Sequence, residues 1–299
     1  MRTRLALLSL ALAACKHHDA PPAQAPRGPD VQPVYQSSGP PDPLAVRFCH
    51  ALRGLADERR KACCHADTSV VADRVTSECE HDVTAALGAH AVTLEVAQLA
   101  ACETAMQAAL GGCDWVGPWP PPVPQACDGL LHGTVGKGER CRSSLECQGA
   151  LRCRDAGPTA PGTCAPAAET GTGCGLAVDA LAAFARQDEV ERTHPECDGF
   201  CERHRCRARQ PLGQECVSPS QCGPDRHCAA GKCVDGAHAR RGEACTGGGC
   251  DAGDRCHQGK CITPAAAGAS CASDFECRGA CNKASGAATG TCAVACSRS

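Results

Sequence analysis

The densest group of side chains that could bind a metal lies within thirteen residues, at positions 194–206 of the chain. Two histidines and three cysteines stand there: His194, Cys197, Cys201, His204 and Cys206. Four ligands of these types suffice for a tetrahedral zinc site. However, no two cysteines in the chain are separated by two residues, the spacing of common zinc and thioredoxin-type redox motifs. We therefore expect disulfides here, with no metal and no cofactor.

Motifs for nucleophilic catalysis are also absent from the sequence. A serine or cysteine nucleophile needs a neighbouring base, yet the chain has no Gly-x-Ser-x-Gly, no His-Glu-x-x-His and no phosphate-binding glycine loop. Small crosslinked units rarely form the deep pockets that enzymes use. We predict no catalytic residues and a protein that is not an enzyme.

Cysteine is frequent and aromatic residues are scarce. The 299 residues include 29 cysteines, but only four Phe, two Trp and one Tyr. Aromatic side chains supply much of the buried area of ordinary domains, so the chain lacks the material for one large core. Small units with little core are held instead by disulfides, each worth roughly 2–4 kcal/mol. The composition predicts a disulfide scaffold in an oxidising compartment.

The N-terminus has the features of an export signal. A positive segment, residues 1–4, precedes the apolar run of residues 5–14. This run is too short to span a bilayer of about 30 Å as a helix, but it suits a signal peptide. The residues that resemble the lipobox of bacterial lipoproteins are Leu12, Ala13, Ala14 and Cys15. The resemblance implies removal of residues 1–14 and acylation of Cys15.

Cysteine parity favours lipidation over ordinary secretion. Acylation of Cys15 leaves an even number of cysteines, whereas cleavage at the A-x-A site of residues 11–13 leaves one orphan thiol. Several acyl chains make a stable membrane anchor. Lys16 stands where inner-membrane lipoproteins of enterobacteria have aspartate, which favours the outer membrane. We expect a lipid-anchored envelope protein that faces the periplasm or the cell surface.

Two proline-rich segments separate the parts of the chain. Residues 15–43 contain eight prolines and almost no apolar side chains, so they are predicted to form an extended, lipidated tether, with the pair His17-His18 solvated. Residues 117–126 are predicted to be a stiff linker. The two tryptophans near it, at positions 115 and 119, are expected to pack on the preceding helices; an exposed pair would instead suggest a binding surface.

Residues 44–116 carry apolar side chains at helical spacing. Three helices are predicted, beginning near Asp42, Asp67 and Thr93. The second is expected to end at Gly88 and the third before a pair of glycines. The predicted core residues are Leu44, Phe48, Leu52 and Leu55 in the first helix, Val71, Val75, Cys79, Val83 and Leu87 in the second, and Leu99, Cys102, Met106 and Leu110 in the third.

The predicted fold of this block is a small disulfide-stapled α-helical bundle. Its six cysteines are Cys49, Cys63, Cys64, Cys79, Cys102 and Cys113. Six cysteines allow fifteen pairings, which the sequence leaves open. The neighbours Cys63 and Cys64 are expected to bond to different partners, because a bond between neighbours is strained.

Residues 127–299 carry cysteines in groups of four. Two consecutive groups nearly repeat each other, as C-x5-C-x5-C-x4-C and C-x4-C-x5-C-x4-C. We predict five small disulfide-rich modules in tandem, arranged as separate beads with little regular structure. Their cysteines are Cys141, Cys147, Cys153 and Cys164; Cys174, Cys197, Cys201 and Cys206; Cys216, Cys222, Cys228 and Cys233; Cys245, Cys250, Cys256 and Cys261; and Cys271, Cys277, Cys281 and Cys292.

Two cysteines and one insertion depart from the repeating pattern of the modules. Cys127 and Cys296 fall outside the groups of four and can pair with each other or exchange with neighbouring groups. The second module carries an insertion between its first two cysteines. Its apolar residues suggest one short helix around Leu176, Leu181 and Phe184.

The third module shows a resemblance to a known family. Its pattern Gly-x-x-Cys-x5-Cys-x5-Cys-x4-Cys, over residues 213–233, resembles the cysteine-rich repeat of myxobacterial lipoproteins, which are often grouped with the Dickkopf N-terminal cysteine-rich region. Residues 127–141, CDGLLHGTVGKGERC, are also similar to that bacterial group. The resemblance covers residues 127–296 and supplies no catalytic residues. It does not extend to the Wnt-antagonist role of animal Dickkopf proteins, because these modules lack the longer animal pattern.

The sequence favours a binding or scaffold role outside the cell. Crosslinked loops lose little entropy on binding, so an extracellular protein or a glycan is the expected partner besides the membrane. Nucleic acid is disfavoured, because residues 42–125 carry 11 acidic and 6 basic side chains and the later residues carry 20 of each. The alternatives are a passive envelope spacer, or a protease inhibitor that presents Arg240-Arg241 between two modules as a substrate-like basic site.

Overall fold

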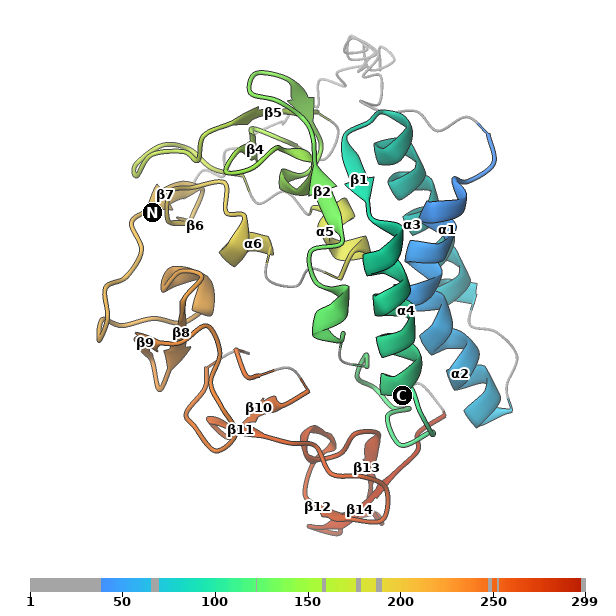
Figure 1. The fold of residues 1–299 in the computed structure, drawn as a ribbon. Coiled ribbons are helices and arrows are strands. Elements are labelled where there is room, and N and C mark those ends of the chain that lie inside the picture. The colour runs from blue at the N-terminus through green and yellow to red at the C-terminus, as the bar shows by residue number, and fades with distance from the viewer. Residues whose placement is uncertain are drawn as a thin grey trace, which may run out of the picture. The chain divides into compact units, whose positions relative to one another are not determined.

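The computed structural model describes most of the chain after residue 38. The described residues are 39–65, 70–121, 123–157, 160–175, 179–186, 190–246, 249–251 and 253–296. The predicted signal peptide, Cys15 and most of the tether lie outside them. Helices dominate the N-terminal side of the described chain, and small sheets of short strands follow (Figure 1).

The regular elements are as follows. The helices are α1 (Pro43–Cys49), α2 (Leu55–Cys64), α3 (Val70–Gly88), α4 (Val96–Ala109), α5 (Ala180–Phe184) and α6 (Val190–Thr193). The strands are β1 (Val92–Leu94), β2 (Leu131–Gly133), β3 (Arg140–Cys141), β4 (Arg152–Arg154), β5 (Gly162–Ala165), β6 (Phe200–Glu202), β7 (Arg205–Arg207), β8 (Arg226–Ala229), β9 (Lys232–Asp235), β10 (Arg255–His257), β11 (Lys260–Ile262), β12 (Ser270–Cys271), β13 (Ala280–Asn282) and β14 (Gly290–Ala293).

The first helix begins where the sequence predicts. Asp42 caps α1, since its carboxylate accepts a bond of 2.7 Å from the N–H of Leu44. A π-helical turn, η1 (His50–Gly54), then joins α1 to α2 without a break. The wider turn shifts the helical register, so that Leu52 is fully buried whereas Leu55 is only partly buried. The predicted apolar stripe therefore ends earlier than expected.

The third helix differs from the prediction at its N-terminus, and the predicted start of the second is not tested. α3 ends at Gly88 as predicted, but its expected start at Asp67 lies outside the described residues. α4 begins at Val96 rather than Thr93, because Thr93 belongs to β1, which pairs antiparallel with β2. That pairing is non-local, so helical spacing could not reveal it. The residues predicted to share a buried face are all fully buried: Leu99, Cys102, Met106 and Leu110.

The helices share their hydrophobic core with the first two modules. The buried cluster around α1, α3 and α4 also contains Leu131 on β2, Leu145 of the first module and Leu181 on α5. α5 is the short helix predicted in the insertion of the second module, although Leu176 lies outside the described residues. Separate beads were expected. The first two modules instead pack on the helices through these apolar side chains.

Four disulfides involve the helical region, which we define as residues 43–116. They are Cys49–Cys79, Cys63–Cys113, Cys64–Cys296 and Cys102–Cys127. The neighbours Cys63 and Cys64 bond to different partners, as predicted. Cys127 and Cys296, whose pairing the sequence left open, both bond to helical cysteines rather than to each other.

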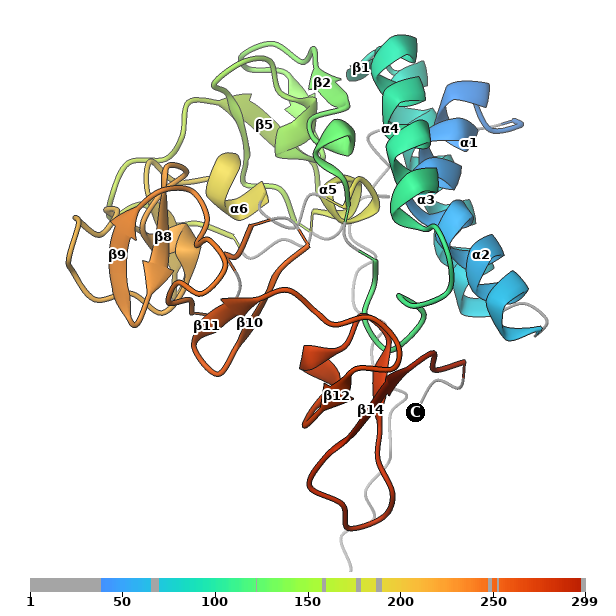
Figure 2. The same ribbon diagram turned by 60° about the horizontal axis from the view of Figure 1, so that its bottom comes forward.

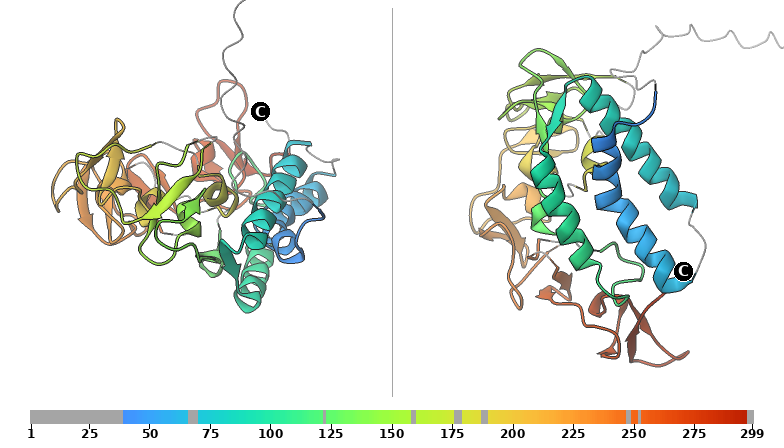
Figure 3. Two further views of the ribbon diagram at one scale, coloured as in Figure 1. Left: turned by 90° about the horizontal axis from the view of Figure 1, so that it is seen from above. Right: turned by 45° about the vertical axis from the view of Figure 1, so that its right-hand side comes forward.

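The end of the described chain returns to the helices (Figure 3). The Cys64–Cys296 bond spans a sequence separation of 232 residues. Trp119 of the linker packs on Phe275 of the fifth module, with ring centroids 4.6 Å apart. Trp115 is buried in the helical core. Packing on the preceding helices therefore holds for Trp115, whereas Trp119 packs on the module that returns to the linker.

Candidate functional site

All five modules have the same disulfide pattern. In each, the first cysteine bonds to the third and the second bonds to the fourth, which the sequence had left open. The bonds are Cys141–Cys153 and Cys147–Cys164; Cys174–Cys201 and Cys197–Cys206; Cys216–Cys228 and Cys222–Cys233; Cys245–Cys256 and Cys250–Cys261; and Cys271–Cys281 and Cys277–Cys292. Each predicted group of four therefore pairs within itself. Sheets β8–β9, β10–β11 and β12–β14–β13 follow one another along the chain (Figure 1).

A glycine turn closes every module. Three residues before the first cysteine stands a glycine with a φ between 78° and 92°, a conformation that favours a residue without Cβ. Its N–H donates to the carbonyl of the fourth cysteine at 2.8 Å in all five modules, and the fourth cysteine donates back to the residue after the glycine. These glycines are Gly138, Gly171, Gly213, Gly242 and Gly268. The Gly-x-x-Cys signal therefore has a structural cause.

A side chain before the second cysteine adds a constraint in four modules. It accepts a hydrogen bond of 2.6–2.8 Å from the N–H of the residue after the first cysteine. These side chains are Glu146, Glu196, Gln221 and Glu276. Gly249 takes this place in the fourth module. Sequence analysis missed these residues, although a recurrent acidic or amide residue ahead of the second cysteine is a readable signal.

The group of histidines and cysteines at residues 194–206 offers no thiolate to a metal. Its three cysteines are all disulfide-bonded, and zinc binds the thiolate form. His204 lies exposed in the turn between β6 and β7, and Nδ1 of His194 contacts the hydroxyl of Thr193 at 3.0 Å. In the part of the chain that the structure describes, every close group of three or more ligand side chains consists of disulfide-bonded cysteines.

Arg240 and Arg241 are exposed but lie in a turn. The N–H of Glu243 donates to the carbonyl of Arg240 at 3.0 Å, around a glycine with a φ of 82°. The preceding Ala239 is fully buried and bridges to Cys250. A substrate-like reactive loop needs an extended, accessible segment, so this geometry gives the inhibitor alternative no support.

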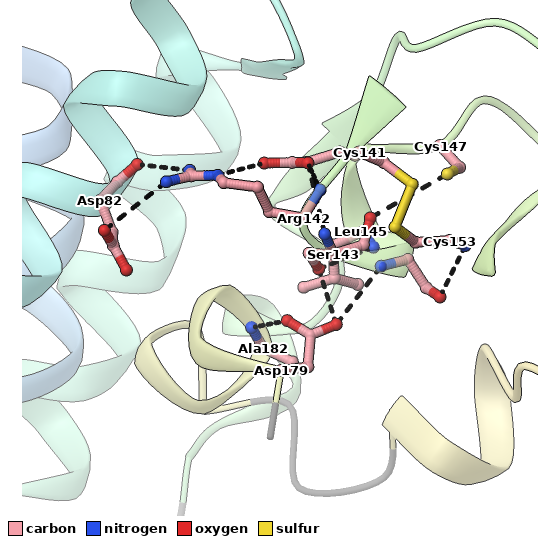
Figure 4. A network of polar contacts seen from close by, with 11 residues as sticks. Asp82, Cys141, Arg142, Ser143, Leu145, Cys147, Cys153, Asp179 and Ala182 are labelled. Atoms are coloured by element: carbon pink, nitrogen blue, oxygen red, sulfur yellow. Dashed lines mark hydrogen bonds and ion pairs between the residues drawn. A yellow bond between two sulfur atoms is a disulfide. The ribbon is translucent and has the colours of Figure 1, made fainter. Parts of the chain in front are cut away.

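The first module meets α3 through Arg142, whose guanidinium lies beside Asp82 (Figure 4) and also beside a buried carboxylate of its own module. Glu146, at the end of the short helix η3 (Ser144–Glu146), is fully buried and accepts bonds from the N–H groups of Arg142, at 2.6 Å, and Ser143, at 3.3 Å. The guanidinium of Arg142 lies 3.4 Å from Glu146 and 3.7 Å from Asp82 of α3. Burial raises the pKa of Glu146, and these bonds and the positive charge oppose the rise.

A second carboxylate ties the insertion of the second module to the same point. Asp179 caps α5, because its carboxylate accepts a hydrogen bond from the N–H of Ala182 at 2.9 Å (Figure 4). The same carboxylate accepts a hydrogen bond from the hydroxyl of Ser143 at 2.8 Å. The Ser143 hydroxyl in turn accepts from the N–H of Leu145 at 3.0 Å, which completes a capping box with Glu146. The Ser-x-x-Glu spacing of that box was available in the sequence. The partnership with Asp179 was not, because it depends on how the insertion folds.

A pocket of about 300 Å³ opens beside this junction. Its apolar lining includes Leu130, Leu131, Leu145 and Ala185, and its imidazoles are His132 and His194. Burial lowers the pKa of His194, the positive charge of Arg152 lowers it further, and Asp179 acts in the opposite direction. The site can therefore take a small, mainly apolar group and offer it a neutral imidazole. Sequence analysis considered His194 as a possible metal ligand but expected no metal; in the structure it lines this pocket together with Leu145 and Ala185.

Comparison of the chain with known protein families, with curated proteins and with solved structures finds no match in any of the three. The resemblance to myxobacterial repeat lipoproteins therefore stays a prediction. Among the residues that the structure describes, no helix has the length and apolar character needed to cross a membrane.

Proposed function

We propose that this protein is a lipid-anchored binding or scaffold protein of the bacterial envelope, attached through Cys15 and directed to the outer membrane. The observation that carries the proposal is the completeness of the disulfide set. Every cysteine from Cys49 to Cys296 has a partner within that range, so none remains for Cys15 inside the chain. A lone cysteine after Leu12-Ala13-Ala14 fits an acylation site.

The crosslinked surface supports a binding role. Five modules with one disulfide pattern and one hydrogen-bonded turn hold their loops in fixed positions, so little conformational entropy is lost when a partner binds. An extracellular protein or a glycan is the proposed partner class, without nucleic acid and without catalysis. A passive envelope spacer is the alternative, since a rigid array also suits a structural role.

The anchor is tested by intact-mass measurement of the full chain after detergent extraction of membranes. The wild type should carry acyl chains on an N-terminal Cys15, and reduction should add the mass of 28 hydrogens for its 14 disulfides. Cys15→Ser should lose the acyl mass and leave the membrane fraction, with all disulfides retained. An unacylated wild type, or membrane retention of Cys15→Ser, would overturn the anchor.

The binding role is tested separately by capture from an envelope extract. Immobilised full-length protein should retain a defined component that a fully reduced and alkylated sample does not retain. Retention of the same components by both samples, or of none by either, would favour the passive spacer.

A further inference from the structure

The pocket beside the junction, which we call the imidazole pocket, is lined by three segments of the chain. They are residues 129–133, the first module with Ser144 and Leu145, and the insertion of the second module with Ala185 and His194. Figure 2 shows β2, within the first of these segments, close to α5 of the insertion. A molecule that enters the pocket would therefore contact three segments that are distant from one another in the sequence.

The apolar wall of the pocket belongs to the main hydrophobic core. The buried members of that core that line the pocket are Leu130, Leu131, Leu145 and Ala185. The volume of about 300 Å³ lies at the lower end for ligand sites, which span about 300–1,000 Å³. An apolar cavity of about 150 Å³ already accepts benzene. The pocket therefore has room for one ring with a substituent, and an apolar ring would gain by leaving water.

Backbone contacts fix the walls of the pocket relative to one another. A Cβ on Gly133 would lie 2.5 Å from the carbonyl oxygen of Cys147, so β2 and the first module approach closely there. The N–H of Val135 donates to the carbonyl of Glu146 at 2.9 Å. The carboxylate of Asp179 accepts a hydroxyl of the first module at 2.8 Å, which holds the insertion in place. The pocket is thus formed before a ligand enters, and this lowers the cost of binding.

Ser144 brings a hydroxyl group to the pocket. Its side chain is buried, and its oxygen accepts a hydrogen bond from the N–H of Cys153 at 3.1 Å. Within the described ranges of the chain, the hydroxyl proton has no acceptor. A buried donor without an acceptor is unfavourable, so a ligand that supplies an acceptor there would be stabilised.

His194 brings a ring nitrogen. Its Nδ1 contacts the hydroxyl of Thr193 at 3.0 Å, and Nε2 has no partner in the part of the chain that the structure describes. Burial, and then the positive charge of Arg152, lower the pKa of this imidazole. A neutral imidazole has one donor and one acceptor nitrogen. A ligand hydroxyl, which both donates and accepts, can therefore bond to Nε2 in either tautomer.

The lining of the pocket carries no fixed charge. None of its described residues is Asp, Glu, Lys or Arg. An ionised carboxylate or an ammonium group would lose hydration in the pocket without meeting an opposite charge on its walls. The lining therefore favours an uncharged ligand.

From the apolar wall, the hydroxyl proton of Ser144 and Nε2 of His194, we propose that the imidazole pocket binds a small uncharged molecule with one hydroxyl on an apolar ring. The ring lies against the leucines of the wall. The hydroxyl bonds to Nε2 of His194, and the proton of Ser144 is available to the same ligand. The proposal deepens the proposed binding role and rests on it for its biological meaning.

The test uses the full-length, disulfide-intact protein in non-ionic detergent and follows ligand binding by fluorine NMR. The probe is para-fluorophenol, whose hydroxyl stays protonated at neutral pH. Its analogue para-fluorotoluene lacks the hydroxyl, and para-fluorobenzoate carries a charge. Detergent without protein corrects for partition into micelles. The probe should bind saturably and about five-fold or more tightly than either analogue. Equal or tighter binding of an analogue, or no saturable binding of the probe, would overturn the proposal.

Substitutions locate the probe in the pocket. Ala185→Leu should fill the space and weaken binding of the probe by about ten-fold or more. His194→Phe keeps a planar ring but removes its nitrogens, and it should weaken binding by about five-fold. His81→Phe is the matched control, because His81 is exposed on α3. It should leave the affinity unchanged.

Circular dichroism and the disulfide count by mass show whether each variant keeps its fold. A folded His194→Phe that binds the probe as tightly as His81→Phe would refute the assigned hydrogen bond. If Ala185→Leu fails to fold, His194→Phe still decides the case, because it changes one side chain that is only half-buried.

The outcome is separable from that of the proposed function. Acylation of Cys15 and capture of an envelope partner do not depend on the probe. If both succeed while the probe fails to bind, the pocket proposal alone is rejected. If the probe binds as expected and Cys15 carries no lipid, the anchor is rejected and the binding site stands.

Discussion

The helical region and the third module are stabilised in different ways. Around the helices, 23 buried residues form one continuous hydrophobic core that includes Phe48, Leu99 and Met106. In the third module, which the structure describes without a gap, the buried cluster consists of four disulfide-bonded cysteines. Its larger apolar side chains face outward, and Val217 is 76% exposed. Disulfides supplement a hydrophobic core in the first region and replace it in the second.

This difference follows from size. A segment of a few tens of residues cannot bury enough apolar surface to offset its conformational entropy. Crosslinks lower the entropy of its unfolded state instead. The helical region gathers a larger core because it recruits Leu145 and Leu181 from the first two modules.

Removing one disulfide from each region gives the largest expected contrast. Cys216→Ala/Cys228→Ala should abolish the fold of the third module, whereas Cys49→Ala/Cys79→Ala should cost roughly 3–4 kcal/mol and leave the helices formed. Loop-closure entropy alone predicts the opposite order, because the sequence separations are 12 and 30 residues. Hydrogen exchange resolved by peptide measures both effects. Retained protection over residues 216–233 in the first variant would contradict the comparison.

Truncating one apolar side chain in each region should destabilise the helical region more than the third module. Phe48→Ala should destabilise the helical region by about 3–5 kcal/mol, because it removes a fully buried aromatic side chain. Val217→Ala should change stability by less than about 0.5 kcal/mol. Urea unfolding of the oxidised protein, followed by far-UV circular dichroism, gives both values. Similar losses in the two variants would mean that Val217 has a packing role that its exposure conceals.

Much of the local structure was predictable because its causes are local. Asp42 is an N-cap followed by proline, and Gly88 ends a helix, so both signals can be read from neighbouring residues. The face that buries Leu99 and Met106 follows from helical spacing. The grouping of the cysteines follows from their repeated spacing, because each group of four pairs internally.

The remaining features depend on residues that are distant in the sequence. β1 forms because Thr93 pairs with His132, and the Cys64–Cys296 bond forms because the fifth module returns to the linker. The imidazole pocket needs the insertion of the second module to place His194 beside the first. A crevice lined by Leu52, Pro120 and Arg186 joins η1, the linker and the residues just after α5. Spacing alone cannot report such contacts.

Glu146 tests the junction between the helical region and the first module. Glu146→Ala should cost roughly 2–4 kcal/mol, because it leaves the N–H groups of Arg142 and Ser143 without their buried acceptor. Glu276→Ala is the matched control. It removes the same bond in the fifth module, but the side chain is 27% exposed and water can replace it. Equal losses in chemical denaturation would show that burial does not set the cost.

The titration of Glu146 should make the free energy of unfolding depend on pH. Its pKa is raised in the folded state above the ordinary value of 4.5, so the folded protein binds this proton more tightly than the unfolded chain does. The stability from this group is present below that value and is lost as the pH rises through the folded pKa. Glu146→Gln should therefore gain stability relative to the wild type as the pH rises above 4.5 and through the folded pKa. A difference that does not change with pH would contradict the assignment.

His194, in the insertion of the second module, should give the smallest effect on stability. Its pH dependence has the opposite sign to that of Glu146. Its pKa lies below the ordinary value of 6.5, because burial and then the positive charge of Arg152 disfavour the imidazolium. Stability from the neutral ring is present above 6.5 and is lost as the pH falls toward the folded pKa. His194→Gln should reduce the fall in the urea midpoint that the wild type shows below pH 6.5. His204→Gln, at an exposed position, should leave that fall unchanged. Equal flattening by both variants would show that the pH dependence does not come from His194 in the pocket.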